Sequence, residues 1–171
     1  MDEAQRDLQA PREEMIAVRL RLKRAREAAG KSHEELGRLV GGRSTYWDLE
    51  CHDAELFMAV SLNQLTRLCA EFGITVRSLF DERFGQESTL TPEQLMLKPK
   101  EHMAQSGLGL GEFEARIGFE FGPALQDPAE VLDWNVDFLR WLCRELALDW
   151  RLALPSTVTK KPEPRSGSGC D

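Results

Sequence analysis

The sequence has no apolar run long enough to cross a membrane, and its first residues, MDEAQRDLQAPREE, are acidic and polar. We therefore expect neither a transmembrane helix nor a signal peptide. The four cysteines are scattered and form no CxxC pair, which argues against a disulfide framework and against a zinc finger. These absences predict a cytoplasmic protein that holds no metal and no other cofactor.

Catalytic motifs are also missing. The sequence shows no glycine-rich phosphate loop, no nucleophile motif and no paired-carboxylate site. Cys51, His52 and Asp53 are adjacent, but neighbours on a helix or a turn point in different directions, and no second His or Cys is close in sequence. We therefore predict that the protein is not an enzyme.

Basic residues are outnumbered, with 22 Lys and Arg against 29 Asp and Glu and a net charge of −7. A protein that binds nucleic-acid phosphates needs a basic face, so this balance weighs against nucleic-acid binding. The apolar fraction of 42% is that of an ordinary soluble protein, and 171 residues can bury one core or two small ones.

What the sequence does contain is a dense series of helix signals between residues 22 and 50. Gly30 is placed to end a first helix, because glycine tolerates a positive φ. Ser32 and Glu35 have the spacing of a capping box, which begins a second helix of about eight residues. Gly41 is placed to end that helix, and a third helix follows. This order is the helix-turn-helix pattern.

The stretch resembles the Cro/C1-repressor type of helix-turn-helix domain, also called the XRE family. The residues that match are Leu22, Arg26, Gly30, Ser32, Leu36, Gly41 and Glu50. Residues 61–80 resemble the fourth and fifth helices of the family, so the resemblance covers roughly residues 16–80. Two features depart from it. His33 stands where the family usually has a phosphate-contacting Gln, and the turn before Glu50 is one residue shorter than usual.

The resemblance implies a sequence-specific DNA-binding transcriptional regulator that acts as a dimer on two half-sites of double-stranded DNA. It also implies a structural ion pair between Arg26 and Glu50. Because a recognition helix places its first side chains at base edges, Arg43 is expected at a guanine. The remaining expected DNA contacts are Lys31, Ser32, His33, Ser44, Thr45 and Tyr46.

The first helix is expected to begin near Pro11, since proline suits a first helical turn. Its basic residues are Arg19, Arg21, Lys23, Arg24 and Arg26. They either flank DNA phosphates or form a solvated face with long aliphatic stems.

The second half of the sequence repeats the first. Gly41 and Gly118 end similar segments at an offset of 77 residues, and Cys69 and Cys143 lie in similar segments at an offset of 74. The three missing residues fall where the second copy would have its recognition helix, and Gly122-Pro123 in that region would break a regular helix.

We therefore predict an all-α fold of two tandem five-helix lambda-repressor-like copies, the second without a regular recognition helix. The expected organisation is a flexible lead-in (1–14), a helix-turn-helix domain (15–83), a linker (84–90), a degenerate helix-turn-helix-like domain (91–154) and a disordered tail (155–171).

Two functions stay open. Between Arg43 and Arg67 there are four acidic residues and no basic one, and between Arg116 and Arg140 there are five acidic residues and no basic one. Acids near a phosphate weaken binding, so the second copy is not expected to bind DNA. The alternative to a DNA-binding regulator is an acidic protein–protein interaction module with a basic protein partner, on a repressor-like fold that no longer binds DNA.

An aromatic stripe in the second copy has two interpretations as well. Trp134, Phe138 and Trp141 recur at helical spacing, and Trp150 follows them. They either fill the core or form an exposed contact for a second subunit.

Overall fold

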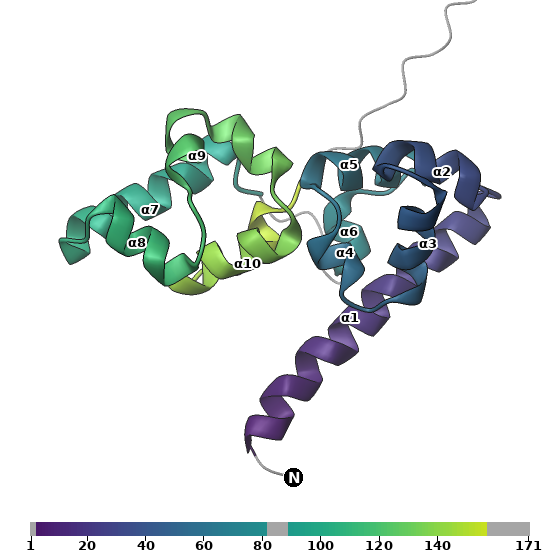
Figure 1. Cartoon of the computed structure of the whole chain (residues 1–171), viewed down its shortest axis with the longest axis horizontal. Coiled ribbons are helices and arrows are strands. Elements are labelled where there is room, and N and C mark those ends of the chain that lie inside the picture. Colours follow the sequence, from purple (N-terminus) through teal and green to yellow (C-terminus); the bar gives the residue numbers. More distant parts are fainter. Residues whose placement is uncertain (1–2, 82–88, 157–171) are drawn as a thin grey trace, which may run out of the picture.

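Helices make up the regular secondary structure of the computed structural model, which describes residues 3–81 and 89–156 (Figure 1). The first half contains α1 (Glu3–Ala28), α2 (His33–Val40), α3 (Arg43–Cys51), α4 (Glu55–Met58), α5 (Leu62–Glu71) and α6 (Val76–Phe80). The second half contains α7 (Pro92–Ser106), α8 (Leu110–Ile117), α9 (Gly122–Gln126), η1 (Pro128–Asp133), α10 (Val136–Glu145) and η2 (Trp150–Ala153), where η marks a 3₁₀ helix. Within these ranges there is no β-strand, so the all-α prediction is confirmed, and no helix is long and apolar enough to span a membrane.

The first helix is longer than predicted. α1 begins at Glu3, eight residues before Pro11, and Figure 1 shows its N-terminal half extending beyond the other helices. Residues 3–10 are mostly Glu, Ala, Gln, Arg and Leu, which have high helix propensity and continue the helix in front of the proline. Most of the predicted lead-in is therefore helical.

Capping boxes begin four of the described helices, and the box at Ser32 was predicted from the sequence. The boxes are headed by Ser32, Ser61, Thr75 and Thr91. In each box the hydroxyl accepts a hydrogen bond from the backbone N–H three residues later, and that later side chain accepts one in return. At the opposite end of α2, Gly41 has φ +101°, a backbone conformation that favours glycine.

The helix boundaries follow the repeat. α2 and α8 are both eight residues long and lie 77 residues apart, and α5 and α10 are both ten residues long and lie 74 apart. Buried side chains correspond too, since Leu36 matches Phe113 and both are at most 1% exposed. Cys69 and Cys143 both lie in the core, and burial raises the pKa of both thiols to about 12.

The two halves differ most at α3 and α9. α3 has nine residues, whereas α9 has five. We had expected Gly122-Pro123 to break a regular helix in this region. These two residues instead begin the short helix α9. Pro123 lies in the first turn of α9, where its missing N–H would have no helical partner in any case.

The aromatic residues of the second half separate into two groups. Trp134, Phe138 and Trp141 surround Phe119, which stacks on Phe138 with ring centroids 4.6 Å apart. Trp141 is 37% exposed, so this group lies at the edge of the core. Trp150 instead packs edge-on against Phe80 of the first half, at 5.6 Å between centroids.

The predicted linker and tail lie mostly outside the described residues. Where the description resumes at Thr89, the hydroxyl of that residue is 2.9 Å from the hydroxyl of Ser156. The backbone N–H of Leu90 donates to the carbonyl of Leu152 at 2.7 Å. The two ends of the second half are therefore adjacent.

Candidate nucleic-acid interface

A close approach between α2 and α3 defines the first half of the molecule. A Cβ atom on Gly37 would lie 2.6 Å from the backbone nitrogen of Arg43 and 2.7 Å from its Cα. Real Cβ atoms do not approach backbone atoms so closely, so the two helices can meet this way only because residue 37 is glycine. The backbone N–H of Gly42 also donates to the carbonyl of Gly37 at 2.8 Å. These contacts fix the angle at which α3 leaves the turn.

A buried ion pair fixes the other end of α3. Arg26 on α1 donates from Nε to Oε1 of Glu50 at 2.6 Å and from Nη2 to Oε2 at 3.1 Å. The side chains of Arg26 and Glu50 are 14% and 5% exposed. Arg19, about two helical turns before Arg26 on α1, donates to the backbone carbonyl of Glu50 at 2.9 Å. The two residues that the family resemblance paired are thus in bidentate contact, and α1 holds α3 in place.

The electrostatics of Glu50 give a testable pH dependence. Burial raises the pKa of this carboxyl, but hydrogen bonds, first of all from Arg26, outweigh burial and leave the pKa below its ordinary value of 4.5. The stabilisation by Glu50 is therefore complete above the pKa of the unfolded chain and is lost as pH falls through the lower pKa of the folded protein.

We expect the free energy of unfolding of the wild type to fall more steeply below about pH 5 than that of Glu50→Gln, which cannot titrate at this position. Urea titrations of both proteins at several pH values measure this difference. Parallel curves for the two proteins would show that Glu50 is not stabilised in its charged form.

The inward face of α3 holds one residue that we had expected at the DNA. Tyr46 is 0% exposed, so the prediction that it contacts DNA is wrong. It lies one helical turn before Glu50 and therefore faces the core side by side with it. Burial, with a smaller effect of the Glu50 carboxylate, raises the pKa of the Tyr46 phenol.

Three expected phosphate contacts at the start of α2 are engaged within the protein. Lys31 forms an ion pair with Glu71 at 3.0 Å. The Ser32 hydroxyl is part of its capping box. Nε2 of His33 is 3.2 Å from the Glu50 carboxylate, and the His33 ring lies 5.2 Å from that of Trp47. The three side chains expected to contact DNA at this helix start therefore already have partners within the protein.

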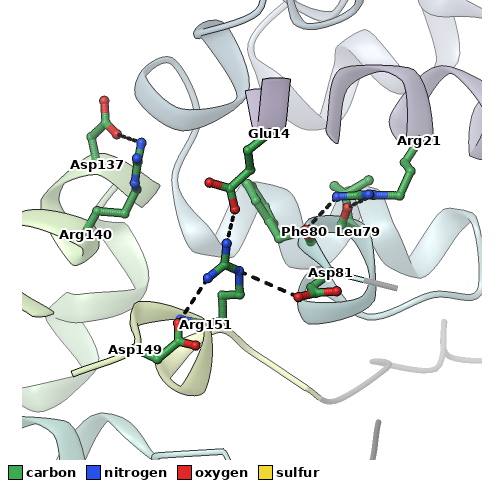
Figure 2. Close-up of polar contacts among 9 residues, drawn as sticks. All are labelled: Glu14, Arg21, Leu79, Phe80, Asp81, Asp137, Arg140, Asp149 and Arg151. Atoms are coloured by element: carbon green, nitrogen blue, oxygen red, sulfur yellow. Dashed lines mark hydrogen bonds and ion pairs between the residues drawn. The ribbon is translucent and has the colours of Figure 1, made fainter. Parts of the chain in front are cut away.

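Some basic residues of α1 are engaged within the protein and others are exposed to solvent. Arg19 pairs with Asp53 at 2.8 Å. Arg21 donates two hydrogen bonds of 2.6 Å to the carbonyls of Leu79 and Phe80 (Figure 2). These two carbonyl groups at the end of α6 therefore have hydrogen-bond donors. Together with Arg26, these arginines hold the first half together, and the solvated residues of the set are Lys23 and Arg24.

The outward face of α3 is the part that remains available to a partner. Arg43 and Ser44 are exposed and Thr45 is half-buried. Trp47, which we had not assigned to the site, is 53% exposed. It lies four residues after Arg43, so both project from the same face of the helix. A cation and an aromatic ring therefore stand side by side on an exposed helix whose two ends are fixed.

The second half lacks each of these features. Glu114 stands at the position of Gly37, 77 residues later, and Met103 stands at the position of Arg26. The Glu114 carboxylate accepts hydrogen bonds from the backbone N–H groups of Phe121 and Gly122, at 2.8 and 2.9 Å. These N–H groups begin α9, so a carboxylate of the protein fills the place where a helix N-terminus could bind a phosphate.

Within the described residues, no group of His, Cys, Asp and Glu side chains is arranged to hold a metal ion. His52 and Asp53, which follow Cys51 in the sequence, contact different residues. Cys51 is exposed, His52 approaches Asp48 at 3.8 Å, and Asp53 pairs with Arg19.

The chain matches no protein-family model, no curated protein and no solved structure. The XRE resemblance thus rests on the residues quoted above, and what it implies about function is a proposal.

Proposed function

We propose that the protein is a sequence-specific DNA-binding transcriptional regulator of XRE type, and that it contacts DNA through α3 of its first half. The observation that carries the proposal is the exposed face of α3, with Arg43, Ser44 and Trp47, on a helix held at both ends. Recognition of base edges requires such a helix, because its side chains must reach a groove in one fixed orientation. The repeated helix boundaries support two tandem copies of one fold, the second without a full recognition helix.

The chemistry of this face suits direct base recognition. The Arg43 guanidinium can donate two hydrogen bonds to O6 and N7 of a guanine, and the Ser44 hydroxyl can contact a base or a phosphate. Trp47 offers apolar contact to a thymine methyl group. Because the chain is acidic overall, its affinity for DNA of arbitrary sequence should be low and strongly reduced by salt. Specific contacts would then account for most of the affinity, and we propose no enzymatic step.

Replacing Arg43 by alanine should lower affinity for the cognate DNA by about 1–3 kcal/mol and relax the preference at one base pair. The matched control is Arg144→Ala, since Arg144 is an exposed arginine on α10 of the second half. It should leave the base preference unchanged. Fluorescence anisotropy with a labelled duplex and its single-base variants measures both proteins. If both variants lost the same affinity for the duplex, Arg43 would contribute only its positive charge and would not recognise a base.

The proposal as a whole is tested by capturing fragmented DNA from the source cell, including the region upstream of the gene, at about 50 and 200 mM salt. We expect enrichment of one short sequence that survives the higher salt. Binding that is weak, without sequence preference, and lost at the higher salt would refute the proposal.

A second candidate function has its own observation. The segment from Glu120 to Asp133 carries exposed acidic side chains, and no Lys or Arg occurs between Arg116 and Arg140. The exposed acids are Glu120, Asp127, Glu130 and Asp133. This face suits a basic protein partner. A partner that co-purifies with the chain and dissociates with salt would support this function, and charge-reversed variants of Glu120 and Glu130 should release it.

A further inference from the structure

The two halves of the chain contact one another through equivalent elements. α5 of the first half packs against η1 of the second, and α10 of the second half packs against α4 of the first. α10 is the counterpart of α5, and η1 follows α9 as α4 follows α3. Exchanging the two halves therefore exchanges these two contacts. Such reciprocity is the property of a two-fold symmetric interface between identical subunits.

The position of the two-fold axis can be recognised from one pair of residues. Ser61 and Asn135 are equivalent caps, 74 residues apart, and they form an antiparallel bridge with each other. Next to this bridge, the N–H of Leu62 donates to the carbonyl of Trp134 at 2.8 Å. The Asn135 side chain donates to the carbonyl of Met58 at 3.0 Å. Equivalent residues can contact each other only where the symmetry axis passes between them.

The same interface is closed by side chains from both halves. Trp150 packs against Phe57 and Phe80, with centroids 6.3 and 5.6 Å away. The Arg140 guanidinium lies 5.2 Å from the Phe57 ring centroid. Figure 2 shows Arg151 reaching the first half, where it forms an ion pair with Glu14 on α1. The surface on which a second chain would dock is therefore covered by the second half of the same chain.

We infer that the protein is a dimer-like unit within one chain and that it binds one non-palindromic half-site, with one chain per DNA site. This inference rests on the proposed function and replaces the homodimer that the sequence led us to expect. A symmetric helix-turn-helix dimer recognises a palindrome because two identical helices enter two half-sites about one helical turn apart. Here the counterpart of α3 is α9, which has five residues instead of nine and carries no basic side chain.

The second half disfavours a second half-site for two reasons. α9 has five residues, and its first N–H groups are bonded to the Glu114 carboxylate. The two-fold relation would also bring the exposed Glu120, which stands 77 residues after Arg43, to the side on which DNA lies. An acidic side chain there repels phosphates, so the second half disfavours contact with DNA beyond the first half-site.

The test uses the full chain and a motif selected from random-sequence DNA. Native mass spectrometry should give a mass of 19.4 kDa for the free protein and one chain on a duplex with one motif. A second duplex carries the motif as an inverted repeat with centres about 10 base pairs apart. We expect two chains to bind it without cooperativity, each within about twofold of the affinity for the single motif.

A selected motif that is palindromic, or cooperative binding more than tenfold tighter on the inverted repeat, would overturn the inference. The experiment distinguishes failure of the proposed function from failure of the dimer-like unit. No binding to any DNA would refute the proposed function and the half-site together. A free protein of twice the chain mass would refute the dimer-like unit even if DNA is bound.

Discussion

Gly37→Ala should destabilise the protein by about 2–3 kcal/mol, although alanine is the better helix former. An exposed helical glycine replaced by alanine normally stabilises a protein by about 0.5–1 kcal/mol. At residue 37 the new methyl group would lie 2.6 Å from the backbone of Arg43. Backbone atoms cannot rotate away as a side chain can, so α2 and α3 must separate, and forced separation of this kind costs more than the helix gains.

The matched control is Gly111→Ala in α8. Gly111 is exposed, and a Cβ there would meet no atom within 4 Å. This variant should be more stable than the wild type by about 0.5–1 kcal/mol. Urea unfolding followed by circular dichroism measures both variants. If Gly37→Ala were neutral or stabilising, the close approach of α2 and α3 would not be a property of the protein. Gly37→Ala should also weaken binding to the selected DNA, because it moves α3.

Glu50→Ala should destabilise the protein by about 3–5 kcal/mol, the larger of the two effects. The substitution removes the bidentate partner of Arg26 and leaves a guanidinium that is 14% exposed with only the longer contact, 3.6 Å, to the exposed Glu27 carboxylate. A largely buried charge that loses its main partner is costly, because it does not regain the water that it gave up on folding. His33 loses its carboxylate contact in the same variant. Thermal unfolding of the variant and the wild type measures the loss.

The control for this prediction replaces both charges. In Arg26→Met with Glu50→Leu, the pair becomes apolar, as the second half suggests with Met103 at the position of Arg26. Apolar replacement of a buried ion pair is often nearly neutral for stability. The double variant should therefore recover most of the stability lost by Glu50→Ala. If it is as unstable as the single variant, shape rather than charge dominates this site.

Features set by a few neighbouring residues were predictable from the sequence. The capping boxes at Ser32 and Ser61 need only residues three apart, and the end of α2 needs only Gly41. The repeat was visible for the same reason, since equal spacing of caps and apolar residues produces equal helices. Helices α1, α2, α3, α5 and α6 of the first half were predicted, whereas the short helix α4 was not.

The partners of the charged residues were not predictable, because tertiary contacts choose them. Lys31 and Glu71 are far apart in sequence, and so are Arg19 and Asp53. Nothing in the local pattern shows that these cations are engaged within the protein. The contacts between the halves are long-range as well, so the sequence did not show them, and the expected homodimer came from the family resemblance.

The burial of Tyr46, by contrast, could have been deduced. Once Glu50 is placed inward to meet Arg26, the residue four positions earlier lies on the same face of the helix. The outward face then consists of Arg43 and Trp47. The sequence alone was therefore sufficient to place Trp47, and not Tyr46, in the candidate site.

The most direct test of whether α3 of the first half, and not the second half, contacts DNA is oxidative footprinting of tryptophan side chains with and without the selected duplex. Trp47 lies on α3 and Trp141 lies on α10 of the second half. Trp47 is 53% exposed and Trp141 is 37% exposed, so both react in the free protein and each serves as the reference for the other. We predict that DNA protects Trp47 several-fold and leaves Trp141 unchanged. Protection of Trp141 alone, or an unprotected Trp47 in a sample where DNA is fully bound, would contradict the account.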